Sequence, residues 1–341
     1  MFIPALCSTF PEGNMQPMPR YLAITLLLLI STAVSSQGTA KDTVAPPDTV
    51  TVGIYITSIH DIDFKQKEYT LSCWLWLTYK NRAFNFAQNL EIPTAKTVSR
   101  QFDTITYRPD GSIYMIMKLQ CVMKDSWKIA NFPFDRQRLR FFIENSQYDS
   151  SMLVFKADTL GDHFDRRYAL NGWVVDTCRL QTTSKRYETA FGDNTAPIPR
   201  AIYSQFRVIL DITRSAGSLF WKMFLGMYIA FFISYTCFYI HSDSIDSRFG
   251  LSVGALFAAI GNKYIIDSAL PESTSFTLVD TLHGLTLFFI FCVISCTAYS
   301  LRLVKKGKQP AAARFDMIAA QALLVLYIAL NIFFISNAAN A

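Results

Sequence analysis

Residues 205–240 read QFRVILDITRSAGSLFWKMFLGMYIAFFISYTCFYI, and the character of the chain changes within this stretch. The part before Arg214 is rich in β-branched and aromatic residues, as strands are, whereas almost every side chain from Leu219 onward is apolar or aromatic. The rest of the 341-residue chain follows the same division, because residues 41–214 carry frequent charges and residues 215–341 are largely apolar. The sequence therefore predicts a water-soluble half followed by a membrane half.

Short strand-like runs separated by turn residues fill the soluble half. The clearest are Val52–Ile59, Tyr69–Tyr79, Ser112–Lys124, Leu139–Glu144, Gly172–Thr183 and Gln205–Thr213. The stretch Arg108-Pro109-Asp110-Gly111 predicts a hairpin turn, because proline presets one backbone dihedral and glycine tolerates a positive φ. Many short strands with regular turns predict an immunoglobulin-like β-sandwich over residues 41–214.

The first forty residues have the features of an export signal. Arg20 precedes the short apolar run Tyr21–Val34, and the small residues Ser35 and Ser36 follow it. A positive flank, a short apolar core and small residues at a cleavage point are typical of a secretory signal peptide. We therefore expect residues 1–40 to be a signal peptide and leader, and the sandwich to lie outside the cytoplasm.

Four apolar segments follow the sandwich, at about residues 219–240, 249–266, 278–303 and 315–336. Each is close to the roughly 20 residues that a helix needs to cross a bilayer. Four crossings from an exported sandwich place the C-terminus outside and the loop before the last segment inside. That loop carries the tightest basic cluster of the chain, as the positive-inside rule requires: Arg302, Lys305, Lys306, Lys308 and Arg314. The sequence predicts a four-helix transmembrane bundle in the cell (inner) membrane.

The second apolar segment differs from the others, because it is rich in glycine and alanine and carries Ser252, Asn262 and Lys263. Polar side chains inside a membrane usually face a bundle interior or water. Small residues alone also suit tight helix packing, which is the simpler interpretation. A helix that lines a water-filled pore explains both features together.

Residues 127–139 read WKIANFPFDRQRL. The Phe-Pro-Phe-Asp core, followed by Gln137, resembles the signature loop of pentameric ligand-gated ion channels, the Cys-loop receptor family. The context agrees, because a β-rich exported half precedes Arg214, four spans follow it, and Pro271 lies between the second and third spans as it does in that family. The resemblance covers about residues 50–337.

Three departures from the family pattern stand out. Asp125 and Leu139 occupy the positions of the two cysteines that form the signature disulfide in animal members, and the loop between the last two spans is short. Both features resemble the prokaryotic branch of the family. Gly226 stands in the first span where relatives usually have a proline, so this helix is expected to bend differently.

The resemblance implies a homopentamer in which a small-molecule or ion agonist binds between neighbouring extracellular domains. Aromatic side chains on the two facing surfaces commonly hold a cationic ligand through their ring quadrupoles. The candidate ligand-binding residues are Tyr79 on the complementary face, Tyr187, Phe191 and Tyr203 beside a capping loop from Ala190 to Tyr203 on the principal face, and in addition Glu144 and Tyr148, which follows Ser146 by two residues. Ser146 replaces the central aromatic residue of many members, which argues against an amine. A solvated acid at a strand end is the simpler interpretation of Glu144.

Coupling between sandwich and membrane is expected where the two meet. The resemblance pairs Asp135 of the signature loop with Arg214, which directly precedes the first span. It also brings the loop with Asp61 and Asp63 against the loop with Pro271, although solvation is the simpler role for Asp63 or Lys65. The candidate coupling residues are Asp63, Phe64, Lys65, Phe132, Pro133, Asp135, Arg214 and Pro271.

A pore-facing stripe follows from helical steps of three and four residues back from Pro271. It contains Asp246, Gly250, Gly254, Phe257, Gly261, Tyr264 and Ser268. Five Phe257 rings would form an apolar constriction, and carboxylates at Asp246 and Asp267 favour permeant cations. Arg248 and Lys263 oppose that preference, but we expect both to lie off the stripe.

The sequence thus predicts a subunit of a pentameric, cation-selective channel that a ligand opens. A nonconducting membrane receptor is the alternative. An enzyme is not expected, because His60, His163, His241 and His283 are scattered without metal-ligand spacing, and we expect no cofactor or metal. The net charge of +6 is dispersed among acids, so nucleic acid is not an expected partner. Three cysteines, Cys73, Cys121 and Cys178, lie in the exported half, so at most one disulfide within the chain is possible there. The simpler interpretation is that all seven cysteines are small buried side chains.

Overall fold

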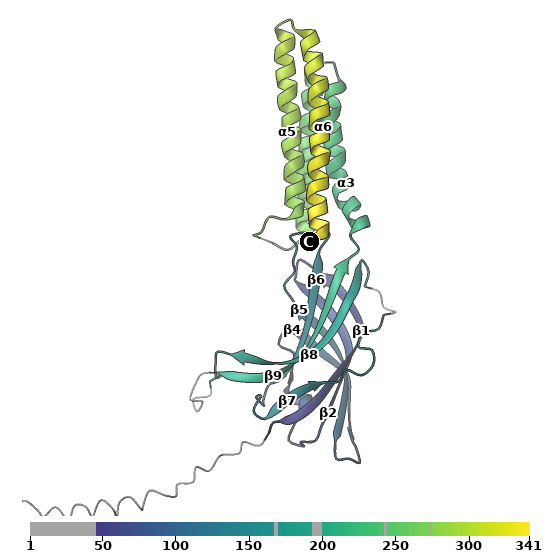
Figure 1. The fold of residues 1–341 in the computed structure, drawn as a ribbon, viewed down its shortest axis with the longest axis vertical. Coiled ribbons are helices and arrows are strands. Elements are labelled where there is room, and N and C mark those ends of the chain that lie inside the picture. The colour runs from purple at the N-terminus through teal and green to yellow at the C-terminus, as the bar shows by residue number, and fades with distance from the viewer. Residues whose placement is uncertain (1–45, 167–169, 193–199, 242–243, 273) are drawn as a thin grey trace, which may run out of the picture. The chain divides into compact units, whose positions relative to one another are not determined.

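The computed structural model describes residues 46–166, 170–192, 200–241, 244–272 and 274–341. The predicted signal peptide and leader, and residues 193–199 of the predicted capping loop, lie outside the described residues. The described chain begins with strands and ends with four long helices (Figure 1). This division confirms the predicted fold class of a β-sandwich followed by a helical membrane bundle.

Two sheets form the sandwich (Figure 1). The first has the order β4-β5-β2-β1-β7, with β1 Asp48–Asp63, β2 Glu68–Tyr79, β4 Ala95–Tyr107, β5 Ile113–Lys124 and β7 Leu153–Ala157. The second has the order β3-β6-β9-β8, with β3 Leu90–Glu91, β6 Arg136–Asn145, β8 Trp173–Tyr187 and β9 Ala201–Arg214. The pairs β1–β2, β2–β5, β4–β5, β6–β9 and β8–β9 are antiparallel, and β1 and β7 run parallel.

The core of the sandwich follows from strict alternation along the strands. In β5 every second residue is buried, from Ile113 to Met123, because successive side chains of a strand point to opposite faces. Gly53 of β1 has a specific role, since a Cβ there would lie 2.2 Å from the Trp76 ring. The missing side chain lets the Trp76 indole cross β1, where its Nε1 donates a hydrogen bond to Asp158 Oδ2 at 2.9 Å.

The predicted hairpin turn is confirmed. Gly111 has a φ of 80° and its amide donates to the Arg108 carbonyl at 3.1 Å, which closes the turn between β4 and β5. The sequence runs missed β4 and β7, and they missed the four-residue helix α2, Phe86–Asn89. All described cysteines are free. Cys73, Cys121 and Cys237 are buried as expected, whereas Cys178, Cys292 and Cys296 are only half-buried.

Four helices complete the chain: α3 Ala216–Tyr235, which continues as the 3-10 helix η1 Thr236–Tyr239, then α4 Ile245–Ala269, α5 Leu278–Lys305 and α6 Gln309–Asn340. All four are long and apolar enough to cross a membrane. A capping box starts α5, because Thr277 Oγ1 accepts from the Asp280 amide while the Asp280 carboxylate accepts from the Thr277 amide. Helix α4 packs between α3 and α5, and α6 packs on α5 and η1.

The signature loop lies where the sandwich meets the helices. Its residues Ile129 and Phe132 belong to one hydrophobic cluster with Phe220 of α3 and Leu278 of α5. The Leu278 amide also donates to the Ala130 carbonyl at 2.7 Å. The loop therefore contacts the first turns of two membrane helices, and it joins the sandwich to that end of the helical bundle.

Candidate functional site

Three aromatic rings gather at the ends of β8 and β9, around the described part of the capping loop. Tyr187 and Tyr203 lie on these paired strands, with ring centroids 6.0 Å apart. Phe191 follows β8 and packs 5.3 Å from Tyr187 and 6.3 Å from Tyr203. The structure therefore brings together three of the candidate ligand-binding residues, with Phe191 on the surface.

Glu144 of β6 lies beneath this aromatic cluster. The Tyr187 hydroxyl donates to both carboxylate oxygens, at 3.1 and 2.9 Å, and Gln205 Nε2 donates to Oε1. Glu144 is only 2% exposed, so the alternative of a solvated acid at a strand end is wrong. Burial raises the pKa of the Glu144 carboxyl, and the hydrogen bonds from Tyr187 and Gln205 oppose that shift. The site presents a buried acidic group beside the exposed Phe191 ring and the half-buried Tyr187 and Tyr203 rings.

Tyr148 and Tyr79 do not join this cluster. The Tyr148 ring packs 4.9 Å from Phe84, and Phe84 lies 6.3 Å from Tyr79. Tyr79 also lines a cavity of about 500 Å³ together with Arg82, Tyr107 and others. Within one chain the ring contacts thus place the candidates in two groups, and Tyr79 is itself buried in the sandwich core at 4% exposure.

Arg214 connects the sandwich to α3 through an unusually dense set of contacts. Its Nε donates to Asp135 Oδ1 at 2.6 Å and its Nη2 to Oδ2 at 3.3 Å. Gln137 Nε2 donates to the same carboxylate at 2.6 Å. The Arg214 and Asp135 side chains are 9% and 1% exposed, so the ion pair is almost fully withdrawn from water.

Three aromatic rings surround the Arg214 guanidinium. Its central carbon lies 4.0 Å from the Trp173 ring centroid, 4.6 Å from Phe64 and 4.9 Å from Phe132. Such cation–π contacts are worth about 0.5–2 kcal/mol each, depending on exposure. The resemblance indicated Phe64 and Phe132 but missed Trp173, which begins β8 far from the motif. Its only sequence signal is the Gly-Trp pair at the start of a strand.

The other coupling candidates lie near this ion pair without joining it. Asp63 and Lys65 are exposed, and Asp63 Oδ1 accepts from the Gln66 amide at 2.8 Å. Pro133 and Pro271 are buried. Phe64 and Leu270, the residue before Pro271, pack against the same hydrophobic cluster at the interface. Both loops thus reach this cluster through apolar side chains, whereas Asp63 and Lys65 are exposed to solvent.

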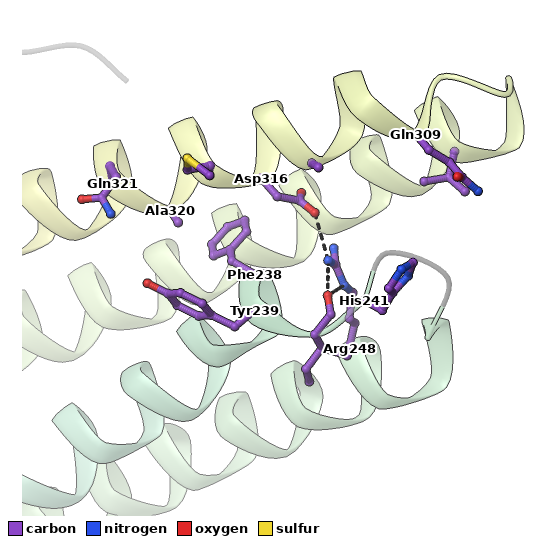
Figure 2. A pocket seen from close by; sticks show the side chains of 12 residues that line it. Phe238, Tyr239, His241, Arg248, Gln309, Asp316, Ala320 and Gln321 are labelled. Atoms are coloured by element: carbon purple, nitrogen blue, oxygen red, sulfur yellow. Dashed lines mark hydrogen bonds and ion pairs between the residues drawn. The ribbon is translucent and has the colours of Figure 1, made fainter.

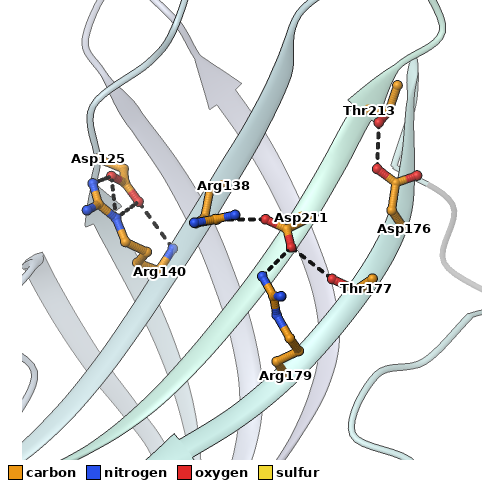
Figure 3. Close-up of polar contacts among 8 residues, drawn as sticks. All are labelled: Asp125, Arg138, Arg140, Asp176, Thr177, Arg179, Asp211 and Thr213. Atoms are coloured by element: carbon orange, nitrogen blue, oxygen red, sulfur yellow. Dashed lines mark hydrogen bonds and ion pairs between the residues drawn. The ribbon is translucent and has the colours of Figure 1, made fainter. Parts of the chain in front are cut away.

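An ion pair closes the signature loop where animal relatives have a disulfide (Figure 3). The Arg140 guanidinium donates from Nε and Nη2 to the buried Asp125 carboxylate, and the Arg140 amide donates to Asp125 Oδ2 at 3.1 Å. Tyr69 in turn donates from its hydroxyl to the Arg140 carbonyl at 2.9 Å. Leu139, the second cysteine position, points into the sandwich core.

The predicted stripe of α4 faces away from the helices of its own subunit. All seven stripe residues, from Asp246 to Ser268, are exposed in the isolated chain, whereas Ser252, Ala255, Ala259 and Ile266 are buried against the neighbouring helices. Phe257 and Tyr264 are the two large side chains on the exposed face. This face is therefore available to a pore or to neighbouring subunits.

Both basic side chains of α4 lie off this stripe and are paired. Arg248 Nη2 donates to Asp316 Oδ2 of α6 at 2.9 Å. Lys263 Nζ lies 2.6 Å from Asp267 Oδ2 and 2.8 Å from Asp280 Oδ1. Among the described residues no ion pair of Asp246 is formed.

No group of three or more His, Cys, Asp or Glu side chains that could hold a metal ion is found within the described parts of the chain. The candidate functional site thus has three parts: the aromatic cluster with Glu144, the Arg214 contacts and the exposed face of α4.

Comparison with known proteins finds relatives among ion channels and receptor subunits. No family model matches the chain. A proton-gated ion channel of Gloeobacter violaceus is 25% identical over an alignment of 362 positions, which covers 96% of each chain. A gamma-aminobutyric acid receptor subunit gamma-4 of Gallus gallus is 20% identical and covers 73% of this chain and 57% of its own. An acetylcholine-gated chloride channel subunit of Caenorhabditis elegans is 22% identical and covers 72% of this chain and 59% of its own.

These relatives are subunits of ion channels, which decides against an enzyme and against a nonconducting receptor. Their alignments extend over sandwich and helices alike, since the first covers nearly the whole chain. The fold, the signature loop and these relatives together show that the chain is a ligand-gated ion channel subunit, a membrane protein that belongs to the family of pentameric ligand-gated ion channels.

Proposed function

We propose that five copies of this chain form a cation-selective channel that opens when a small organic cation binds between neighbouring sandwich domains. The observation that carries the agonist class is the buried Glu144 carboxylate beneath the Tyr187, Phe191 and Tyr203 rings. Ring faces attract a cation through their quadrupoles, and a carboxylate adds a full opposite charge nearby. The cavity beside the buried Tyr79, which the exposed Tyr107 also lines, would complete the site from the neighbour.

This arrangement compensates for the absence of the central aromatic residue at Ser146. A protonated primary amine needs hydrogen-bond acceptors as well as a ring face, and Glu144 supplies an acceptor that a tryptophan would not. A quaternary ammonium has no N–H to donate, so it would gain less from the carboxylate. The geometry therefore favours primary amines over quaternary ammonium compounds.

The test is a panel of primary amines, matched quaternary ammonium compounds and carboxylic acids, applied to the full-length channel under voltage clamp. We expect current with a primary amine, and a loss of amine sensitivity of at least about tenfold in Glu144→Gln. Glu188→Gln is the matched control, because Glu188 directly follows β8, is exposed, and forms its ion pair with Arg186 at the surface. A panel in which only acids open the channel would refute the agonist class.

A proton is the second candidate agonist. Burial raises the pKa of Glu144, so this carboxyl takes up a proton at a higher pH than an ordinary glutamate does. The Gloeobacter relative is named as a proton-gated channel. Current that appears on acidification without any amine, and that Glu144→Gln removes, would favour the proton over the amine.

Cation selectivity is supported by the charge balance along α4. Arg248 is neutralised by Asp316, and Lys263 by Asp267 and Asp280, so neither basic residue places an uncompensated charge beside the stripe. Asp246 then contributes five carboxylates at one mouth of a pentameric pore. Because one of the relatives is a chloride channel, reversal potentials in a sodium chloride gradient are the deciding measurement.

We further propose that the channel is a homopentamer in the cell (inner) membrane, with the sandwich and the C-terminus outside the cytoplasm. The polar face of α4 supports a closed ring, because one subunit cannot hide it from lipid. The basic turn with Lys305, Lys306 and Lys308 between α5 and α6 supports the orientation. Native mass spectrometry tests the stoichiometry, and labelling of single cysteines at Lys306 and Ala341 tests the orientation.

A further inference from the structure

A cavity of about 590 Å³ lies among η1, α4, α5 and α6, at the end of the bundle near the α5–α6 turn (Figure 2). Helix α5 starts at the sandwich with Leu278 and has 28 residues, so its far end lies about 42 Å away at 1.5 Å per residue. The cavity is therefore remote from the agonist site and from the Arg214 contacts. Its volume is within the range of about 300–1,000 Å³ that is typical of ligand sites.

One stripe of α6 forms a wall of this cavity at helical spacing. It consists of Gln309, Ala313, Asp316, Met317, Ala320 and Gln321. Phe238 and Tyr239 of η1 and Val304 of α5 line it as well, so most of the lining is apolar. Met317 and Tyr239 are exposed on helices that cross the membrane. The cavity thus opens toward the acyl chains of the bilayer.

Two charged residues form the polar end of the cavity. Arg248 donates to Asp316 Oδ2 at 2.9 Å and to the Ile240 carbonyl, as Figure 2 shows. The two side chains are 3% and 4% exposed. Arg248 Nη1 and Asp316 Oδ1 are buried and have no hydrogen-bond partner among the described residues. A buried donor or acceptor of a charged group without a partner is costly, so each of these atoms calls for a ligand.

The chemistry of that ligand follows from the two atoms. Arg248 Nη1 requires an acceptor, Asp316 Oδ1 requires a donor, and a hydroxyl group provides both. The ion pair is neutral as a whole, so the site does not demand an anion. The apolar walls and the opening toward the bilayer require an apolar tail on the same molecule.

We propose that this cavity binds a membrane lipid whose glycerol headgroup places its hydroxyls on Arg248 and Asp316. The acyl chains then leave between Tyr239 and Met317 into the bilayer. Because Arg248 belongs to α4, whose opposite face forms the exposed stripe, the bound headgroup ties the end of that helix to α6. The site is independent of the agonist and of the ion that permeates.

The test is native mass spectrometry of the delipidated full-length channel, titrated with phosphatidylglycerol and with phosphatidylmethanol of the same acyl chains. Both lipids carry one negative charge, but only phosphatidylglycerol carries free glycerol hydroxyls. We expect phosphatidylglycerol to bind at least about tenfold tighter. Equal binding of the two lipids would overturn the proposal, because the headgroup hydroxyls would then not be recognised.

Two sets of variants locate the binding. Arg248→Met combined with Asp316→Leu removes both unpartnered atoms and keeps the volume, and replacing a buried ion pair in this way is often tolerated. It should abolish the tenfold preference, and a preference that persists places the lipid elsewhere. Ala313→Trp fills the cavity and should prevent binding, whereas Ala311→Trp, at an exposed position two residues away that does not line the cavity, should leave binding unchanged. If the double variant does not assemble, the comparison of Ala313→Trp with Ala311→Trp shows whether the lipid binds in this cavity.

A structure of the channel in phosphatidylglycerol nanodiscs distinguishes a bound lipid headgroup from bound water. We expect headgroup density between Arg248 Nη1 and Asp316 Oδ1. Density for one or more water molecules alone at that place, with no lipid in the cavity, would refute the proposal, because water can satisfy both atoms as well.

Discussion

Breaking the ion pair between Asp135 and Arg214 should damage the channel more than any surface substitution, because the pair is almost fully buried. Asp135→Ala leaves the Arg214 guanidinium without a counter-charge, and Arg214→Ala leaves the Asp135 carboxylate with only the Gln137 amide. Removing one partner of a buried pair costs about 3–5 kcal/mol. Arg214→Ala should be the worse of the two, since it also loses the contacts with the Trp173, Phe64 and Phe132 rings.

The double variant Asp135→Ala/Arg214→Ala should cost less than the sum of the single variants, because no unpaired charge remains in it. Coupling energies between contacting residues are about 0.5–3 kcal/mol, so we expect non-additivity of at least about 1 kcal/mol. Two quantities are measured for the wild type, both single variants and the double variant: the melting temperature of the purified pentamer and the agonist concentration that gives half-maximal current. Each single variant should lower the melting temperature by on the order of 10 °C or prevent assembly.

Arg214→Lys is the informative control for this cycle. It keeps the positive charge but loses the planar, two-pronged contact with the carboxylate and the stacking on the Trp173 ring. We expect an intermediate loss of stability and of agonist sensitivity. Strictly additive single effects, or a channel with Arg214→Ala that assembles and gates as the wild type does, would refute the reasoning.

Three further predictions concern the pore and the agonist site. Asp246→Asn should lower the preference for sodium over chloride, and an unchanged reversal potential would remove Asp246 from the selectivity mechanism. Phe257→Ser should give current without agonist, since an apolar ring opposes wetting of the pore, and Tyr264→Ser should have a smaller effect at matched surface expression. Because burial raises the pKa of Glu144, the folded chain holds this proton more tightly than the unfolded chain does, so acidification should neutralise the carboxylate and weaken an amine agonist. In Glu144→Gln the amine response should not depend on pH over the same range.

Much of the fold was visible in the sequence, because burial imposes a pattern where one face of an element packs inward. In β5 each second residue from Ile113 is buried, and the run was predicted to within one residue. Strand β4 was missed since its residues are almost all exposed in the isolated chain, so no alternation of burial marks the segment from Lys96 to Tyr107. Its strand conformation depends on pairing with β5, which is a long-range property.

The functional residues likewise divide into those that the local sequence predicts and those that depend on long-range pairing. Asp135 and Arg214 were predicted because Asp135 belongs to the signature motif and Arg214 directly precedes the first span. Trp173 was missed, because only the pairing of β8 with β9 brings it opposite Arg214. Tyr148 was chosen because it follows Ser146, at the position of the central aromatic residue, by two residues, but its ring packs against Phe84 instead. Side-chain direction at the end of a strand is not fixed by sequence spacing.

The Asp125–Arg140 pair has a consequence for where and how this channel can be made. A loop that two cysteines close needs an oxidising compartment, and it opens again when a reductant is added. Here the same loop is closed by charge and hydrogen bonds, so its formation requires no thiol oxidant or isomerase and reversibly accompanies folding itself. Dithiothreitol should therefore leave both assembly and current intact, and Asp125→Asn, which keeps the size but removes the charge, should loosen the loop in oxidising and reducing media alike.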